Sequence, residues 1–285
     1  MNRPLQHDSQ PAVVSLPVKA TCKAWDSDEQ RLVCIAEETP IAFRYDGFSH
    51  AVMMATPDDL QDFAVGFSRT EGVIKTSTDL RDISISQSDD GTTIDISLGS
   101  DALHRYLATR RIRQLRGHTS CGLCGVEDLH DVHRLHVRVR QAPPLSSEPI
   151  LSALAALRQW QPLSRVTRGA HASAWVARDG TLQIVREDVG RHSSLDKLIG
   201  AMLRSGLRAD DGFGLITSRC SFEMVQKAVA AGFPALVSAG APTALAIRSA
   251  MAAGLTLYSV SRDGEPLQFT SPLRSEDEVC LQPAS

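Results

Sequence analysis

The sequence lacks the features of a membrane protein and of a secreted one. No apolar run approaches the roughly 18 residues that a membrane span requires. Residues 1–18 carry one early arginine and then proline, aspartate and serine, in place of the apolar stretch of a signal peptide. We therefore expect a cytoplasmic protein with no membrane association. In that compartment the six cysteines are expected to be reduced, catalytic or metal-bound.

An excess of positive charge is also absent. The 285 residues contain 30 Lys and Arg against 33 Asp and Glu, for a formal net charge of −3. This balance argues against broad binding to nucleic acid, which usually needs a strongly basic surface. Binding of an anion must therefore be local. The length allows two domains, and we find no internal repeat.

A complete zinc site is not visible either. Cys121 and Cys124 form one Cys-x-x-Cys pair, but the chain has no second pair and no zinc deaminase signature. His118 and His130 flank the pair at spacings unlike those of known zinc sites. A thioredoxin-type oxidoreductase is disfavoured because the pair follows a basic helix in mid-chain instead of opening a small domain. We expect no bound metal.

The Cys-x-x-Cys pair itself is the most informative motif. Gly122 and Gly125 keep bulky side chains away from the sulfurs, and five arginines precede the pair. Only the thiolate is nucleophilic, and nearby positive charge favours it, so the pattern indicates thiols suited to attack another sulfur. The arginines are Arg105, Arg110, Arg111, Arg113 and Arg116.

The N-terminal half predicts a small α+β domain. We expect residues 1–20 to be a disordered tail, 21–115 the domain, and 116–150 the cysteine loop and a linker. Thr56 is predicted to cap a helix with Pro57 at its first position. The expected strands are 31–36, 41–45, 50–54, 83–85 and 93–98, with turns at Asp46-Gly47 and Asp89-Asp90-Gly91 and a basic helix at 101–115.

The C-terminal half, 151–274, predicts an α/β domain followed by a loose tail at 275–285. Strands alternate with helices, which implies a largely parallel sheet covered on both faces. Ser193 is predicted to cap one of the helices. The expected strands are 174–177, 182–185, 213–217, 235–238, 255–260 and 267–269, and the expected helices are 151–160, 193–205, 222–231 and 243–253.

The ends of three predicted strands carry candidate binding residues. Two of these ends run directly into helix N-termini, where backbone N–H groups and the helix dipole attract anions. Arg219 and Arg262 are suited to clamp phosphates. An anionic, nucleotide-containing ligand is one interpretation, and short loops with serine caps in an ordinary sheet are the other. The segments are Ser218–Ser221, Ser238–Thr243 and Val260–Glu265.

A charged run, Arg186–His192, lies between a strand and a helix. It indicates either the rim of an active site or a solvated loop whose charges pair with each other. His192, just before the predicted helix, is placed to donate to a phosphate or sulfur ligand. His171 lies among small residues and is a candidate for the same pocket or for the core.

The remaining cysteines stand alone in the sequence. Cys22, Cys34 and Cys280 are interpreted as ordinary thiols. Cys220 is next to Arg219 and just ahead of a helix N-terminus, conditions that lower a thiol pKa. It is either a third reactive thiol or a small residue that fills space, and we favour the second.

Taken together, these motifs resemble the FdhD family, the formate dehydrogenase accessory sulfurtransferases. The resemblance runs in order from about residue 30 to 272. The segments that carry it are Val52–Leu60, Cys121–Gly125, Glu187–His192, Asp196-Lys197, Ser218-Arg219, Ser221–Lys227, Ala241–Thr243 and Gly254–Leu257.

The resemblance implies a sulfurtransferase that takes persulfide sulfur from an IscS-like cysteine desulfurase. The sulfur would pass to the molybdenum cofactor with two molybdopterin guanine dinucleotides, which then enters formate dehydrogenase. It also implies a C-terminal three-layer domain like that of cytidine deaminases, and we expect a homodimer. By motif match, Cys121 bears the persulfide, Cys124 is its partner, and Val260–Glu265 contacts the cofactor. We add Ser218, Arg219, His192 and Thr243 as contacts for its GDP-like moiety.

The chain departs from the family pattern at a few positions. Cys220 stands where a small residue without a thiol is usual, Gly240 is unusual in its loop, and Ser271 and Glu265 replace other residues near the last strand. An alternative from another class is a chaperone that binds the cofactor without transferring sulfur.

Overall fold

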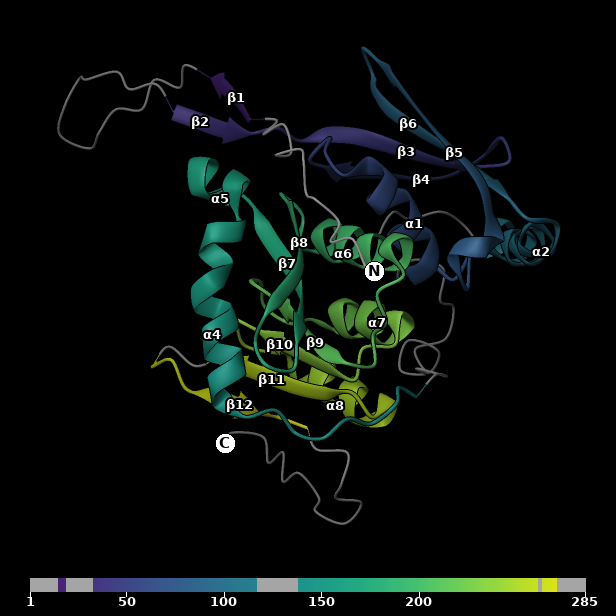
Figure 1. The fold of residues 1–285 in the computed structure, drawn as a ribbon. Coiled ribbons are helices and arrows are strands. Elements are labelled where there is room, and N and C mark those ends of the chain that lie inside the picture. Colours follow the sequence, from purple (N-terminus) through teal and green to yellow (C-terminus); the bar gives the residue numbers. More distant parts are fainter. Residues whose placement is uncertain (1–14, 19–32, 117–137, 261–262, 271–285) are drawn as a thin grey trace, which may run out of the picture.

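A computed structural model of the chain describes residues 15–18, 33–116, 138–260 and 263–270. Within these residues, two larger sheets with their own helices meet at one helix–helix contact, and a short two-stranded ribbon lies beside them (Figure 1). The arrangement is a mixed α/β fold, in which the smaller N-terminal unit precedes the larger C-terminal one. None of the helices described is long and apolar enough to cross a membrane.

The N-terminal unit is a four-stranded sheet of order β4-β3-β6-β5. Alternation buries one face of it, including Phe43, Ile94 and Ile96, against α1. Asp46 and Gly47 have φ of 47° and 82°, which confirms the predicted turn. The elements are β3 Thr39–Tyr45, β4 Phe48–Ala55, α1 Leu60–Thr70, η1 Ser77–Asp79, β5 Leu80–Ser88, β6 Gly91–Leu98 and α2 Ser100–Arg116.

The expected tail 1–20 contains a strand that the sequence did not reveal. β1, Ser15–Val18, pairs antiparallel with β2, Val33–Ala36. Helix α5, Pro162–Thr167, packs against this ribbon. The pairing depends on residues from the C-terminal half, which is why local sequence did not predict it.

The C-terminal sheet has six strands in the order β12-β11-β10-β9-β7-β8. Only β9, β10 and β11 form parallel pairs, so the expectation of a largely parallel sheet was wrong: β7, β8 and β12 each pair antiparallel through hairpins or as neighbours. The strands are β7 His171–Ala177, β8 Leu182–Asp188, β9 Gly212–Ile216, β10 Ala235–Ser238, β11 Thr256–Val260 and β12 Pro266–Gln268.

Helices cover both faces of this sheet, as the alternation predicted. One face packs on α4 through residues such as Ile150 and Phe213, and the other packs on α6, α7 and α8 through residues such as Leu198 and Leu236. Figure 1 shows α4 on one side of the strands and these three helices on the other. The helices are α4 Ser147–Leu157, with η2 Arg158–Trp160 after it, α6 Arg191–Ser205, α7 Phe222–Ala231 and α8 Ala244–Ala253.

Helices α1 and α6 join the two units. Gly66 on α1 faces Gly200 on α6, so the backbones approach closely. On one side of the glycines Asp62 forms an ion pair with Arg204, and on the other the Thr70 hydroxyl donates to Asp196 at 2.7 Å. Each helix thus presents a polar residue, a glycine and a polar residue at four-residue spacing, and the two series meet in opposite directions.

Two predicted helix starts were wrong. α1 begins at Leu60, after Asp59 with φ 52°, and Thr56 lies outside it. α6 begins at Arg191 after Gly190, and Ser193 is buried inside the helix. In both cases a tertiary contact outweighs local capping, because Thr56 and Gly190 bond to the side chain of Asp188.

Candidate functional site

The carboxyl ends of β8, β9, β10 and β11 meet at one edge of the C-terminal sheet, which we call the carboxyl edge. Ser238 pairs in register with Ile216 on one side and with Ser259 on the other. His171, at the start of antiparallel β7, pairs with Asp188 at the end of β8. The topology therefore brings the predicted strand-end segments and the charged run to a single edge, where ligands of such sheets bind.

The loops that follow β9 and β10 pack directly on each other. The Thr243 N–H donates to the Cys220 carbonyl at 3.0 Å, and the Gly240 N–H donates to the Ser218 carbonyl at 3.2 Å. A Cβ on Gly240 would lie 3.0 Å from the backbone of Arg219. This close approach explains the unusual glycine, since a side chain there would push the two loops apart.

The side chains of these two loops differ in their availability. Arg219 is exposed and makes no hydrogen bond or ion pair with the rest of the described chain. Thr243 is exposed and caps α8, with its Oγ1 accepting the Ala246 N–H at 3.2 Å. Ser218 is buried, and its hydroxyl donates to the Arg219 carbonyl at 3.0 Å, so it shapes the loop from inside.

The charged run is divided between structural and available groups. Arg186 binds Asp62 of α1 through Nε at 2.8 Å, and Glu187 accepts the N–H groups of Leu163 and Ser164 at 2.8 Å each. Asp188 is buried against Lys197. Both sequence interpretations therefore need correction: these charges pair, but across the fold and not with each other. Arg191 and His192 remain at the edge.

His192 opens α6 beside the first turn of α7. Burial lowers its pKa, and the positive charges of Arg191 and Lys227 add to that shift. Its Nε2 is buried and has no hydrogen-bond partner in the described chain. Burial likewise lowers the pKa of His171, helped by Arg191. Both imidazoles therefore favour the neutral form, in which each ring offers one donor and one acceptor.

The last strand end completes the edge in part. Val260 pairs with Pro266 of β12, and the Ser259 hydroxyl donates to the Gly240 carbonyl at 3.2 Å, which ties this hairpin to the loop after β10. Asp263, Gly264 and Glu265 are exposed, and Gly264 turns the chain with φ 81°. Ser261 and Arg262 lie outside the described residues.

The thiols give a mixed result. Cys121 and Cys124 lie outside the described residues, so their roles stay predictions. Arg105, predicted to favour the thiolate, is 3.0 Å from Asp79 in an ion pair. Cys220 is fully buried in the main core, and burial raises its pKa to about 12. This overturns the expectation of a lowered pKa and agrees with the packing role.

A buried cluster that sequence reasoning missed lies directly behind the edge. The Lys197 ammonium is 2.6 Å from Asp188 Oδ2 and donates to the Thr56 carbonyl at 2.9 Å. Near it, Lys227 is 2.7 Å from Asp196. The available signal was Lys197 itself, a lysine inside the apolar stripe Leu195, Leu198 and Ile199, where a charge requires a partner.

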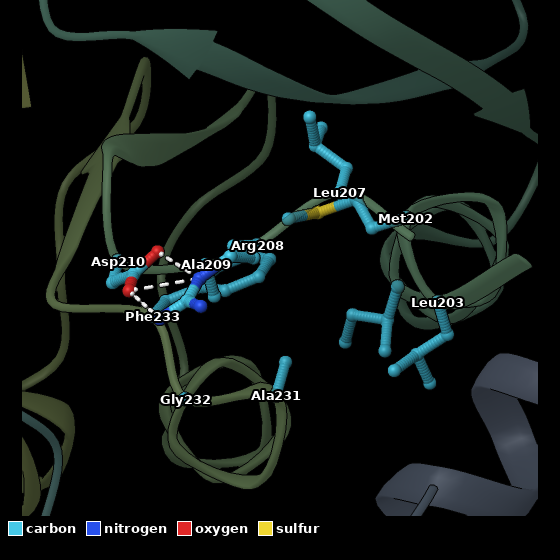
Figure 2. A pocket seen from close by; sticks show the side chains of 10 residues that line it. Met202, Leu203, Leu207, Arg208, Ala209, Asp210, Ala231, Gly232 and Phe233 are labelled. Atoms are coloured by element: carbon cyan, nitrogen blue, oxygen red, sulfur yellow. Dashed lines mark hydrogen bonds and ion pairs between the residues drawn. The ribbon is translucent and has the colours of Figure 1, made fainter. Parts of the chain in front are cut away.

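A separate cavity of about 320 Å³ lies at the opposite end of the sheet, between the ends of α6 and α7 and the start of β9. Figure 2 shows mostly apolar side chains around it, with the Arg208–Asp210 ion pair at one side. Since Asp210 already neutralises Arg208, this cavity is poorly suited to phosphate. No group of three or more His, Cys, Asp or Glu placed to hold a metal occurs among the described residues.

Comparison with known proteins identifies the relatives of the chain. A family model described as the FdhD/NarQ family matches residues 36–276. A "Sulfur carrier protein FdhD" from Cupriavidus necator is 44% identical over 247 residues, covering 87% of this chain and 85% of its own. One of the same name from Bordetella petrii is 44% identical over 240 residues, covering 84% and 86%.

A solved structure supports the fold. The crystal structure of a protein from Desulfotalea psychrophila, proposed to be a formate dehydrogenase accessory protein, superposes with a TM-score of 0.70 at 24% identity. It covers 91% of this chain and 98% of its own. At this identity the likeness concerns the fold alone.

Proposed function

Because the chain belongs to the FdhD/NarQ family, we propose that it is a cytoplasmic sulfurtransferase for the maturation of formate dehydrogenase. Cys121 accepts sulfur from a cysteine desulfurase, Cys124 assists, and the sulfur passes to a molybdenum cofactor with two pterin guanine dinucleotides. The cofactor is a substrate that binds at the carboxyl edge. We further propose a homodimer and a cytidine deaminase-like C-terminal unit.

One observation supports the binding half of this proposal above the others. The carboxyl edge presents an exposed, unpaired Arg219 between the N-termini of α7 and α8, with His192 at the start of α6. Guanidinium groups and helix N-termini are both suited to the phosphates of a guanine dinucleotide. In the proposed arrangement Arg219, His192 and Thr243 contact the phosphates, and Asp263–Glu265 lie beside them.

The sulfur step follows ordinary thiol–disulfide chemistry. The Cys121 thiolate attacks the outer sulfur of the desulfurase persulfide, the S–S bond of the donor breaks, and the desulfurase cysteine leaves as a thiolate. Cys121 then carries the persulfide. The chain re-enters the described region at the other end of the sheet, where the Val139 N–H donates to the Ala253 carbonyl at 2.9 Å. The fourteen residues from Cys124 to Arg138 reach up to about 50 Å, longer than the roughly 17 Å of a five-residue strand.

The test is mass spectrometry of the protein after incubation with a cysteine desulfurase and cysteine. We expect the peptide around Cys121 to gain one sulfur atom, Cys121→Ala to lose both this gain and formate dehydrogenase maturation, and Cys34→Ala to behave as the wild type. A Cys121→Ala protein that still gains sulfur on this peptide and matures the enzyme would overturn the assignment. A Cys121→Ala protein that retains maturation without loading would favour the chaperone alternative.

The ligand half is tested by calorimetry with GDP, and with ADP as the comparison. Binding of GDP that is weakened by His192→Ala supports the carboxyl edge as the nucleotide site. Equal affinity for the two nucleotides would argue against recognition of guanine.

A further inference from the structure

The ammonium group of Lys197 is buried completely, one turn inside α6. Its partners are the Asp188 carboxylate at 2.6 Å and the Thr56 carbonyl at 2.9 Å, and it lies 5.8 Å from the centre of the Phe63 ring. Two of these three partners belong to the N-terminal unit. A buried charge is costly unless it is paired, so a lysine here requires this set of contacts. Its position also prevents it from touching a ligand.

Asp188 transmits this anchoring to the chain that leads into α6. Its Oδ1 accepts the Gly190 N–H at 2.8 Å, and its Oδ2 accepts the Thr56 N–H at 3.0 Å. The Thr56 hydroxyl in turn accepts the Val189 N–H at 3.2 Å. Two successive backbone N–H groups of the turn, at Val189 and Gly190, are thus held by one buried cluster. The next two residues are Arg191 and His192.

We propose that Lys197 is a positioning residue for the carboxyl edge. By holding Asp188 charged and in place, it fixes the Val189-Gly190 turn, and this turn sets where Arg191 and His192 stand against the ligand. Because Thr56 supplies one side of the cluster, the edge takes its binding geometry only when the N-terminal unit is packed on α6. The inference rests on the proposed function for its ligand and on the contacts above for its mechanism.

A purely structural role predicts a different outcome. Loss of an ordinary interdomain ion pair lowers stability but leaves the edge unchanged once the protein is folded. Arg204 provides a matched control, because it pairs with Asp62 across the same α1–α6 interface and does not contact the turn. Arg204→Met therefore reports the cost of a lost interdomain charge pair alone.

The experiment uses the full chain and two readouts, the Kd for GDP by calorimetry and the NMR signals of the His192 ring. The main variant is Asp188→Asn with Lys197→Met, which removes both charges and leaves no buried ion unpaired. Thr56→Val is a milder second variant, which removes only the acceptor for the Val189 N–H. We expect each folded variant to shift the His192 signals, and the double variant to weaken GDP binding about tenfold. Arg204→Met should do neither.

The proposal is wrong if either variant folds with the His192 signals and the GDP affinity of the wild type. If the wild type itself does not bind GDP, the proposed ligand is wrong, yet the His192 signals still decide whether Lys197 positions the turn. A failure of the positioning role and a failure of the proposed function are therefore distinguishable.

Discussion

Gly66 and Gly200 face each other where α1 crosses α6. A Cβ added to Gly66 would lie 2.8 Å from the backbone nitrogen of Gly200, and a Cβ added to Gly200 would lie 2.8 Å from that of Gly66. Each would also overlap a carbonyl of the opposite helix, that of Asp196 or Asp62. Since the obstructing atoms are backbone, no rotamer change relieves the contact, and the helices must separate.

Gly66→Ala and Gly200→Ala should therefore each destabilise the protein, by about 1–3 kcal/mol or more, as overpacked cores do. Alanine favours helix over glycine, so the sign opposes helix propensity. Gly169→Ala is the control, because its added Cβ would meet nothing closer than 3.8 Å. Urea unfolding measures all three. An unchanged or raised midpoint for either helix variant would contradict the close approach.

Cys220 should resist alkylation in the native protein. With its pKa raised to about 12 by burial, the thiolate fraction at neutral pH is about a thousandfold below that of an ordinary thiol. We expect peptide mass spectrometry to show slow labelling of Cys220 by iodoacetamide, and rapid labelling after unfolding in urea. Partly exposed Cys34 provides the comparison within the same protein. Fast native labelling of Cys220 would restore the reactive interpretation.

Arg219→Ala should weaken GDP binding about fivefold without changing stability. The side chain is exposed and unpaired in the described chain, so its loss removes a charge-assisted phosphate contact and no structural one. Arg208→Ala is the matched control, since Arg208 is also exposed but lies before β9, at the other end of the sheet. Unchanged GDP affinity in Arg219→Ala, measured by calorimetry, would reject the phosphate contact.

The two edge histidines should make stability depend on pH. Burial lowers the pKa of His171 and of His192 below the ordinary value of 6.5. As the pH falls, the unfolded chain takes up these protons first, so the free energy of unfolding decreases from about pH 7 to about pH 5. A His171→Gln/His192→Gln protein should lose less stability over this range in urea titrations. The same slope in both proteins would show that neither histidine is held neutral.

Cys124→Ala should impair delivery of sulfur while loading of Cys121 persists. Two thiols three positions apart can relay a sulfur or close a disulfide that releases it. Loading is measured on the peptide by mass spectrometry, and delivery by formate dehydrogenase activity. Normal delivery by this variant would make Cys124 dispensable.

Elements with strong local signals were predicted well. The helix 222–231 and the strand 235–238 have the bounds observed for α7 and β10, and Thr243 caps α8 as expected. Glycine after each helix and an apolar stripe within it are sufficient for such assignments. The gathering of the strand-end segments at one edge followed from topology alone.

The buried cluster could not be predicted, because its partners are distant in the sequence. Thr56 has the local pattern of a helix cap, but its N–H donates to Asp188, 132 residues away. Asp62 pairs with Arg204 across 142 residues. A single sequence gives no measure of which separated polar residues meet. It therefore indicated that Arg186–His192 was important without showing which of its charges are structural.

The bond between the Lys197 ammonium and the Thr56 carbonyl spans 141 residues, and this separation has a consequence for synthesis. At about 5–20 residues per second, roughly 7–30 seconds pass between the appearance of Thr56 and that of Lys197. During this interval α1 leaves the ribosome with Asp62, Gly66 and the apolar residues beside them uncovered, and a short isolated helix is only marginally stable in water. Completion of the N-terminal unit must therefore wait for α6, so the nascent chain is most exposed to misfolding and to chaperones while its first half is waiting for the second.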